Sequence, residues 1–189
     1  VEFSSEFVGS IETHEAALNL DQLEKLSANL GDGTAIGDHL IDMAETFSDE
    51  IDFAAMEKLI SNVGDDVEFD QDFINILGDK LDGHTGTVDS DFMNNIYGNA
   101  DDTVAFGSDI VNNMDKVDGD LESAIIQGFV DEAASDAEFE TEFLDYLEDK
   151  TIDLSTEQLE IIGSQLEDTA VVNDYFLAAA EDHIEDLDF

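Results

Sequence analysis

The chain of 189 residues contains no cysteine, no proline, no tryptophan and no arginine, and it has only five lysines. The absence of cysteine excludes disulfides and thiolate metal sites, and it fits an extracellular bacterial protein. Fifty acidic residues against five lysines give a formal net charge of −45. A surface of this charge repels nucleic-acid phosphates and anionic lipid headgroups, so we expect no nucleic-acid partner.

The sequence also lacks any apolar run near the roughly 18 residues that a membrane-spanning helix requires, so we expect no membrane insertion. Hydrophobic residues nevertheless make up 42% of the chain, which is enough to form a core. Because self-repulsion opposes compaction, we expect high salt or divalent cations to stabilise the fold.

Apolar residues recur along the whole chain with a period of 33. One column of the repeat consists of Phe3, Ile36, Phe69, Phe106, Phe139 and Val172. A second column, four residues later, consists of Phe7, Leu40, Phe73, Ile110, Phe143 and Phe176. A four-residue insertion near residues 81–87 lengthens one step to 37. We therefore expect one continuous array, with a first half at 1–80, a longer loop at 81–87 and a second half at 88–189.

Each repeat contains two helical patterns. The first begins at a residue that can cap a helix N-terminus. One apolar residue stands directly before this position and another stands four residues after it, which is the spacing of a hydrophobic staple. These predicted starts are Asn19, Asp52, Asp89, Glu122 and Ser155, four of which are residue types favoured at the N-cap. The apolar stripe then continues at helical spacing, for example at Met56, Leu59 and Val63.

The second pattern is expected to begin at another set of capping residues, which are Asp32, Asp65, Asp102, Ser135 and Asp168. Its apolar face would contain the Phe3 and Phe7 columns, and we expect no strand to compete with it. Short helix hairpins cannot bury their apolar stripes alone, whereas stacked neighbours can. The predicted fold is therefore all-α, with about eleven helices stacked as an α-solenoid-like array.

The two ends of the sequence fall inside repeats. Val1 corresponds to Val67, which lies two residues after the predicted cap Asp65. Leu187, Asp188 and Phe189 fall on the staple and cap positions where another helix would start. We expect this sequence to be a window onto a longer array, or a subunit that its neighbours complete.

The period of 33 suggests ankyrin or tetratricopeptide repeats, but their signature residues are absent. Gly86 stands where the ankyrin pattern of Asp82–Thr85 requires proline. The chain instead resembles the tandem acidic segments of very long secreted bacterial surface proteins of the RTX-adhesin type, in being Asp-rich, Lys-poor, Cys-free and repetitive throughout. That resemblance implies calcium-dependent rigidity, export and an adhesive or filamentous role, but it assigns no binding residue.

The predicted metal ligands are clusters of aspartates in the loops between units, because Ca²⁺ takes six to eight oxygen ligands. These candidates are Asp49, Asp52, Asp79, Asp82, Asp89, Asp91, Asp115, Asp118, Asp120, Asp149 and Asp153. No complete EF-hand loop is present. The alternative interpretation is that these aspartates are helix caps and solvated turns, which Asp also favours.

The sequence contains no arrangement typical of an enzyme, so we expect a non-enzymatic protein. The lysines near predicted helix ends are expected to offset the helix dipole or to pair with carboxylates. The leading hypothesis is a structural segment of a long extracellular or cell-surface protein, a spacer or filament subunit that contacts neighbouring repeats or copies of itself and is stabilised by Ca²⁺. The alternatives are a helical scaffold for a basic partner protein and an acidic cation-buffering or salt-adapted protein.

Overall fold

The computed structural model describes residues 2–31 and 33–183. Two compact units divide the chain: unit 1 comprises 1–76 and 88–103, and unit 2 comprises 77–87 and 104–189. The division falls within one helix, so that residues before Leu77 belong to unit 1 and the rest of that helix belongs to unit 2. Each unit is described by itself below.

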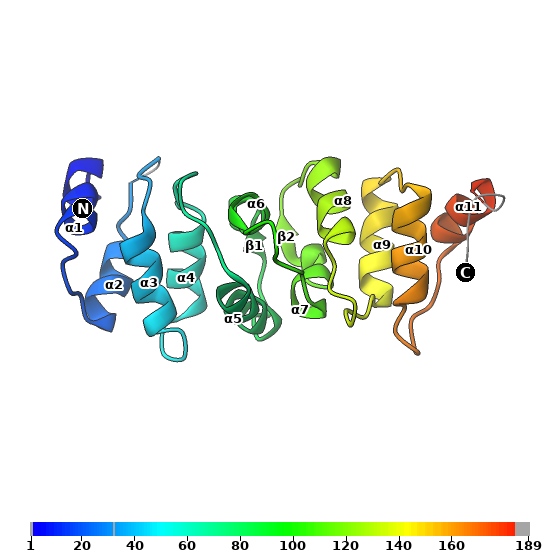
Figure 1. The fold of residues 1–189 in the computed structure, drawn as a ribbon, viewed down its shortest axis with the longest axis horizontal. Coiled ribbons are helices and arrows are strands. Elements are labelled where there is room, and N and C mark those ends of the chain that lie inside the picture. The colour runs from blue at the N-terminus through cyan, green and yellow to red at the C-terminus, as the bar shows by residue number, and fades with distance from the viewer. Residues whose placement is uncertain (1, 32, 184–189) are drawn as a thin grey trace. The chain divides into compact units, whose positions relative to one another are not determined.

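Unit 1 contains most of the first half of the chain. Its elements are α1 (Ser5–Thr13), α2 (Leu20–Ser27), α3 (Asp38–Thr46), α4 (Phe53–Ile60), the first part of α5 (Gln71–Asp82), β1 (Val88–Asp89) and α6 (Ser90–Asn99). Helices α2, α3 and α4 lie side by side, α1 packs on α3, and α4 also contacts α6 (Figure 1).

Unit 2 contains the remaining elements. They are the end of α5, α7 (Ser108–Val111), the 3₁₀ helix η1 (Met114–Lys116), β2 (Val117–Asp118), α8 (Ser123–Asp131), α9 (Thr141–Lys150), α10 (Thr156–Ser164) and α11 (Asp174–Asp182). Helix α8 packs on α10, and α9 contacts both η1 and α11 (Figure 1).

The described residues form eleven α-helices, which confirms the predicted helical class and helix count. The expectation that no strand would form was wrong, since the chain also contains two strands of two residues each. None of the described helices is both long enough and apolar enough to span a membrane.

The helices that follow the first sequence pattern (α2, α4, α6, α8 and α10, here called the first helices) begin where the sequence predicts. Their N-caps are the predicted residues Asn19, Asp52, Asp89, Glu122 and Ser155. The Asp52 carboxylate accepts the backbone N–H of Ala55 at 2.7 Å, which satisfies a donor that the helix leaves unpaired. Four of the five caps make such a side-chain bond, and Glu122 does not.

The helices of the second pattern (α1, α3, α5, α7, α9 and α11, here called the second helices) begin later than predicted where the sequence assigned a start. The predicted caps Asp65, Asp102, Ser135 and Asp168 all lie in turns, and Asp32 lies outside the described residues. The observed N-caps of α3, α7, α9 and α11 are Gly37, Gly107, Glu140 and Asn173, each five residues further on.

Short polar side chains explain this correction, because they can close a turn and compete with a helix. The Asp101 carboxylate accepts the backbone N–H of Thr103 at 2.9 Å and its hydroxyl at 2.6 Å. The chain then runs extended through an apolar residue before the helix begins. The Phe3 column therefore lies in this extended lead-in and not on the helical face where we expected it.

Each described residue of the Phe3 column from Phe3 to Phe139 forms an isolated parallel bridge with a residue just after a first helix. The five bridges are Phe3 with Leu30, Ile36 with Val63, Phe69 with Ala100, Phe106 with Ala133 and Phe139 with Leu166. At the last of these, the Phe139 amide donates to the Gln165 carbonyl at 2.8 Å and the Phe139 carbonyl accepts from Glu167 at 3.0 Å. Each bridge thus fastens the start of one second helix to the end of the following first helix.

The core lies behind these bridges and is rich in phenylalanine. In unit 1, Phe69 and Phe92 are fully buried. In unit 2, Phe106 and Phe129 meet edge to face with ring centroids 4.6 Å apart, and Phe139 stacks on Phe143 at 5.1 Å. Aromatic pairs of this geometry contribute about 0.5–1.5 kcal/mol beyond the area that they bury.

Candidate functional site

The aspartates predicted as metal ligands all lie on the exposed surface. Two of them, Asp52 and Asp89, act as N-caps, and Asp89 accepts the N–H of Asp91 at 3.0 Å. Capping and metal binding draw on the same carboxylate oxygens. The observed role of these two residues is that of a helix cap, and calcium binding by them stays a prediction.

The remaining predicted ligands lie at helix ends and in loops. Asp49 follows α3, Asp79 and Asp82 lie in the last turns of α5, Asp115 is in η1, Asp118 is in β2, Asp120 follows it, Asp149 is near the end of α9 and Asp153 precedes α10. Within residues 2–31 and 33–183, no three His, Asp or Glu side chains are arranged to hold a metal ion. The calcium sites therefore stay a prediction.

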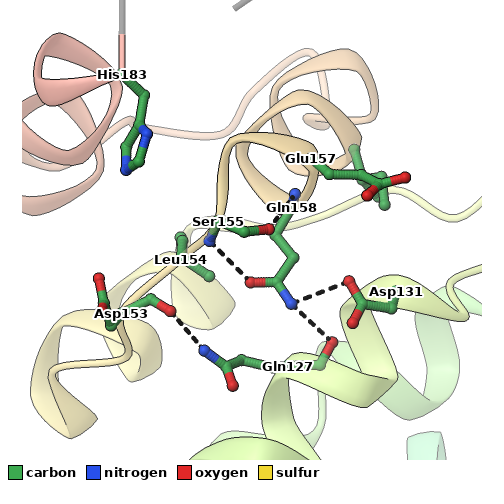
Figure 2. Close-up of a pocket in the computed structure, with 9 residues that line it drawn as sticks. Gln127, Asp131, Asp153, Leu154, Ser155, Glu157, Gln158 and His183 are labelled. Atoms are coloured by element: carbon green, nitrogen blue, oxygen red, sulfur yellow. Dashed lines mark hydrogen bonds between the residues drawn. The ribbon is translucent and has the colours of Figure 1, made fainter. Parts of the chain in front are cut away.

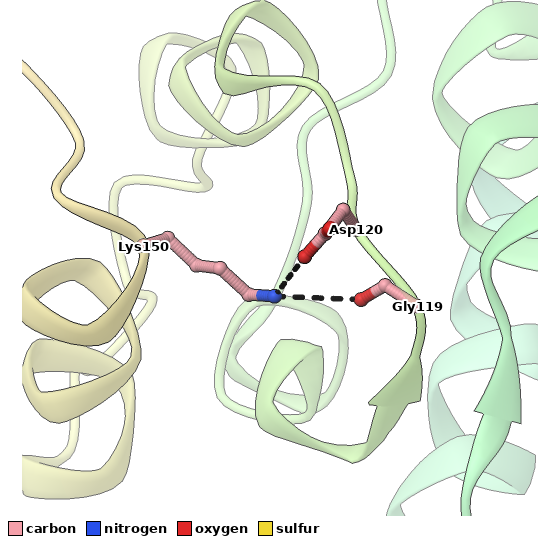
Figure 3. A network of polar contacts seen from close by, with 3 residues as sticks. All are labelled: Gly119, Asp120 and Lys150. Carbon is pink, nitrogen blue, oxygen red and sulfur yellow. Dashed lines mark hydrogen bonds and ion pairs between the residues drawn. The ribbon is translucent and has the colours of Figure 1, made fainter.

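A lysine occupies one of the predicted acidic loops. The Lys150 ammonium, at the end of α9, lies 2.6 Å from the Asp120 carboxylate and also donates to the Gly119 carbonyl at 3.4 Å (Figure 3). The hydrogen bond from Lys150 lowers the pKa of Asp120. The predicted pairing of lysines with neighbouring carboxylates is confirmed at this position.

A second lysine fastens the loop that carries the insertion. The Lys116 ammonium donates to the main-chain carbonyls of Leu81 at 3.2 Å and of His84 at 2.7 Å. The Leu81 carbonyl lies in the last turn of α5 and the His84 carbonyl lies in the loop that follows. At a helix C-terminus a cation can bind carbonyls that have no partner in the helix, and it also interacts favourably with the helix dipole. Lys116 and Lys150 thus place a positive charge at each of two acidic loops, 79–89 and 115–120.

Carboxylates lie near one another in unit 2 where the end of α5 meets the start of α7. Partial burial, together with the nearby charges of Asp82 and Asp79, raises the pKa of Asp109. The helices approach closely because residue 78 is glycine; a Cβ there would lie 3.2 Å from the Asp109 Cβ. A cation bound near Asp79 and Asp82 would reduce their effect on Asp109.

Glu140 lies in the same region of unit 2. Its pKa is raised by partial burial, by Glu142 and Glu167, and by Asp82 and Asp115. Tyr146, on α9, is buried, and its hydroxyl has no hydrogen-bond partner among the described residues. Burial and the charges of Asp120 and Asp115 raise the pKa of Tyr146 to about 12. The acidic loops therefore impose a negative potential on the groups around them.

Surface grooves form a second candidate site, which the sequence did not predict. One groove has a volume of about 600 Å³ and lies between α8 and α10 in unit 2 (Figure 2). Its floor is organised by Gln158, which donates to Asp131 at 2.9 Å and accepts the Ser155 amide at 3.0 Å. Asp153, Glu157 and His183 line its edge.

Similar grooves occupy the corresponding position in unit 1. One of about 300 Å³ lies between α2 and α4 and includes Asp52. Another of about 480 Å³ includes residues of α4 and α6, with Asp89 and Asp91. Each of the three grooves contains the N-cap residue of a first helix, namely Asp52, Asp89 or Ser155. Grooves that contain a cap residue thus lie between three pairs of first helices, α2 and α4, α4 and α6, and α8 and α10.

Comparisons of the chain with protein-family models, with curated proteins and with solved structures find no match.

Proposed function

We propose that this chain is a non-enzymatic structural segment of a long extracellular protein, a spacer or filament subunit built from stacked 33-residue helix hairpins. The observation that carries the proposal is the series of bridges, whose first partners are spaced by 33, 33, 37 and 33 residues. A connection that recurs in register through backbone groups joins each hairpin to the next. A solenoid-like array stabilised by nearest-neighbour interfaces has this organisation.

Divalent cations, Ca²⁺ first among them, are the second part of the proposal. A net charge of −45 on 189 residues opposes compaction, and lysines supply only five positive charges. The raised pKa of Asp109 next to Asp79 and Asp82 supports α5 and its loop as the place where a cation relieves most repulsion. Cation binding at that position would stiffen the segment between its hairpins.

Thermal unfolding in Ca²⁺, Mg²⁺ and KCl at matched ionic strength tests this function. We expect Ca²⁺ to raise the midpoint beyond KCl, because binding to the folded state stabilises it by about 2.7 kcal/mol at a hundredfold excess over Kd. The variant D82N should lose part of the calcium-specific increment, whereas D42N, which removes the same charge at an exposed position of α3, should retain it. Equal stabilisation by all three salts would contradict the calcium part of the proposal.

A helical scaffold for a basic partner is the second candidate function. The grooves between successive first helices favour it, since they repeat and contain carboxylates such as Asp131, Asp153 and Glu157. Such a surface suits lysine or arginine side chains spaced along an extended segment. If the salts stabilise the protein equally, this candidate becomes the better supported of the two.

A further inference from the structure

The groove between α4 and α6 in unit 1 combines both signs of charge, although the chain as a whole is strongly acidic. Its volume is about 480 Å³. Its charged and hydrogen-bonding side chains include Lys58, Ser61 and Asn62 from the end of α4, and Asp89, Asp91 and Asn95 from the start of α6. One of the five lysines of the chain thus faces a groove that also contains two carboxylates.

The corresponding groove of unit 2, between α8 and α10, has a different lining. The repeat places Gly128 at the position of Lys58, and Asp131 at the position of Ser61. The Asp131 carboxylate accepts a hydrogen bond from the Gln158 side chain at 2.9 Å. The positive charge at position 58 and the hydroxyl at position 61 therefore distinguish the groove of unit 1 from that of unit 2.

The Ser61 hydroxyl has no hydrogen-bond partner among the described residues, although its oxygen is buried. Phe92 stands on α6 at the repeat position of Gln158, and it has no polar group to offer Ser61. A buried hydroxyl without a partner is unfavourable, because it has lost its hydrogen bonds to water. A ligand group that bonds the Ser61 hydroxyl would therefore gain affinity from it.

The other polar groups of the groove are available in a similar way. The Lys58 ammonium forms no ion pair or hydrogen bond with another described residue. Asn62 and Asn95 donate through their amide nitrogens to the carbonyls of Lys58 and Ile60, each at 2.8 Å. These bonds orient the two side chains and leave their amide oxygens as acceptors. The groove therefore offers a cation, a hydroxyl and several acceptors to one ligand.

We propose that the groove between α4 and α6, here called the mixed groove, binds a short peptide by its two charged ends. The terminal carboxylate would lie against the Lys58 ammonium and the Ser61 hydroxyl, and the terminal ammonium against the Asp91 carboxylate and the Asn95 amide oxygen. An extended tripeptide spans about 10 Å, and small-molecule sites have volumes of about 300–1,000 Å³.

Charge favours such a zwitterion over an ion of either sign. A chain of net charge −45 repels an anion, whereas a purely cationic ligand would be repelled by Lys58 and would leave the Ser61 hydroxyl without an acceptor. A zwitterion has no net charge and satisfies both ends of the groove. This inference goes beyond the proposed structural function and does not depend on it.

The test is an NMR titration of the full ¹⁵N-labelled chain with triglycine at pH 7, where both peptide termini are charged. We expect saturable shifts at the amides of Ser61, Asn62 and Asn95. N-acetyl-triglycine lacks the ammonium and triglycine amide lacks the carboxylate, so each should bind at least about tenfold more weakly. Free glycine, which is too short to reach both ends of the groove, should also bind more weakly than triglycine.

The chain offers a matched control for Lys58. K58M should weaken triglycine binding by at least about tenfold, whereas K58R, which retains the positive charge, should bind nearly as well as the unchanged chain. Lys25 is the corresponding lysine of α2; it is exposed and does not line the mixed groove. K25M removes the same charge and should leave binding unchanged. D91N, on the other side of the groove, should weaken triglycine but not N-acetyl-triglycine.

Several results would overturn the proposal. Equal binding of triglycine and its two blocked forms would show that the peptide termini are not recognised. Equal losses in K58M and K25M would show that only the overall charge matters, and tighter binding by K58M would identify the ligand as a cation. Shifts confined to residues outside the mixed groove, or glycine binding as tightly as triglycine, would also contradict it.

Discussion

Side-chain caps are more frequent at the first helices than at the second helices of the described chain: four of the five first helices begin at such a cap, against three of the six second helices. The first helices α2, α4, α6 and α10 begin at a residue whose own side chain bonds the first turn. The second helices α3, α7 and α9 have no such side-chain cap. Two of their N-cap residues are held by other segments instead: the Gly37 amide donates to Glu12 at 2.8 Å, and the Glu140 amide donates to Asn112 at 3.1 Å.

This comparison implies that α3 and α9 depend on another segment at their N-termini, whereas most first helices are capped by a residue of their own sequence. The bridges reinforce the dependence, since each fixes a lead-in residue against the end of another helix. Substitutions in the lead-ins should therefore cost more stability than substitutions of the caps. The predictions below test that ranking.

The largest effect is expected at a lead-in phenylalanine. Phe139 is fully buried, bridges Leu166 and stacks on Phe143. F139A should lower the free energy of unfolding by about 3–5 kcal/mol, because it opens a cavity in the core. Denaturant unfolding followed by circular dichroism measures this loss. F7A is the control: Phe7 is stacked on Phe3 but is 48% exposed, and its loss should stay within about 1 kcal/mol.

A moderate effect is expected at the caps, where the chain offers a matched pair. D52A removes the carboxylate that accepts the Ala55 amide and should cost about 1 kcal/mol. E122A changes the corresponding N-cap of α8, which makes no side-chain bond, and should leave the free energy of unfolding nearly unchanged. Equal costs in the two variants would show that the side-chain bond is not what defines the first helices.

The smallest effect concerns the charge at the start of α7. The raised pKa of Asp109 means that its protonated form is favoured in the folded state, so the stabilisation is present at acidic pH and is lost as the pH rises through the folded pKa. D109N should therefore raise the unfolding midpoint at pH 7, by no more than about 3 °C. Calorimetry at pH 3 should find little difference. D42N, at an exposed position of α3, should show no such pH-dependent gain.

The sequence was sufficient to predict the helical class and the first helices, because cap, staple and stripe all lie within a dozen residues of one another. The start of the second helices could not be predicted from capping residues alone. Val67 and Phe69 are both buried and are separated by exposed Glu68, an alternation of period two that indicates an extended segment. That pattern is present in the sequence, but the interpretation of Asp65 as a helix cap assigned Val67 and Phe69 to a helix.

The candidate sites were less predictable than the helices. Aspartates that are close in sequence, such as Asp49 and Asp52, are recognisable as a cluster, yet their separation in space depends on which of them caps a helix. The clamp of Lys116 on Leu81 and His84 joins residues 32 to 35 positions apart. The grooves likewise require two successive first helices to be packed together. Neither the Lys116 hydrogen bonds nor the grooves correspond to a pattern among residues that are close in the sequence.

The bridges also bear on how the chain folds. They join residues 27 positions apart, or 31 where the insertion intervenes, so every bridge closes a loop of nearly the same modest length. The entropy lost in closing a loop grows only slowly with its length, and contacts of short sequence separation favour rapid folding. A chain connected in this way can order one hairpin before its distant segments exist, as happens when a polypeptide emerges gradually from the ribosome.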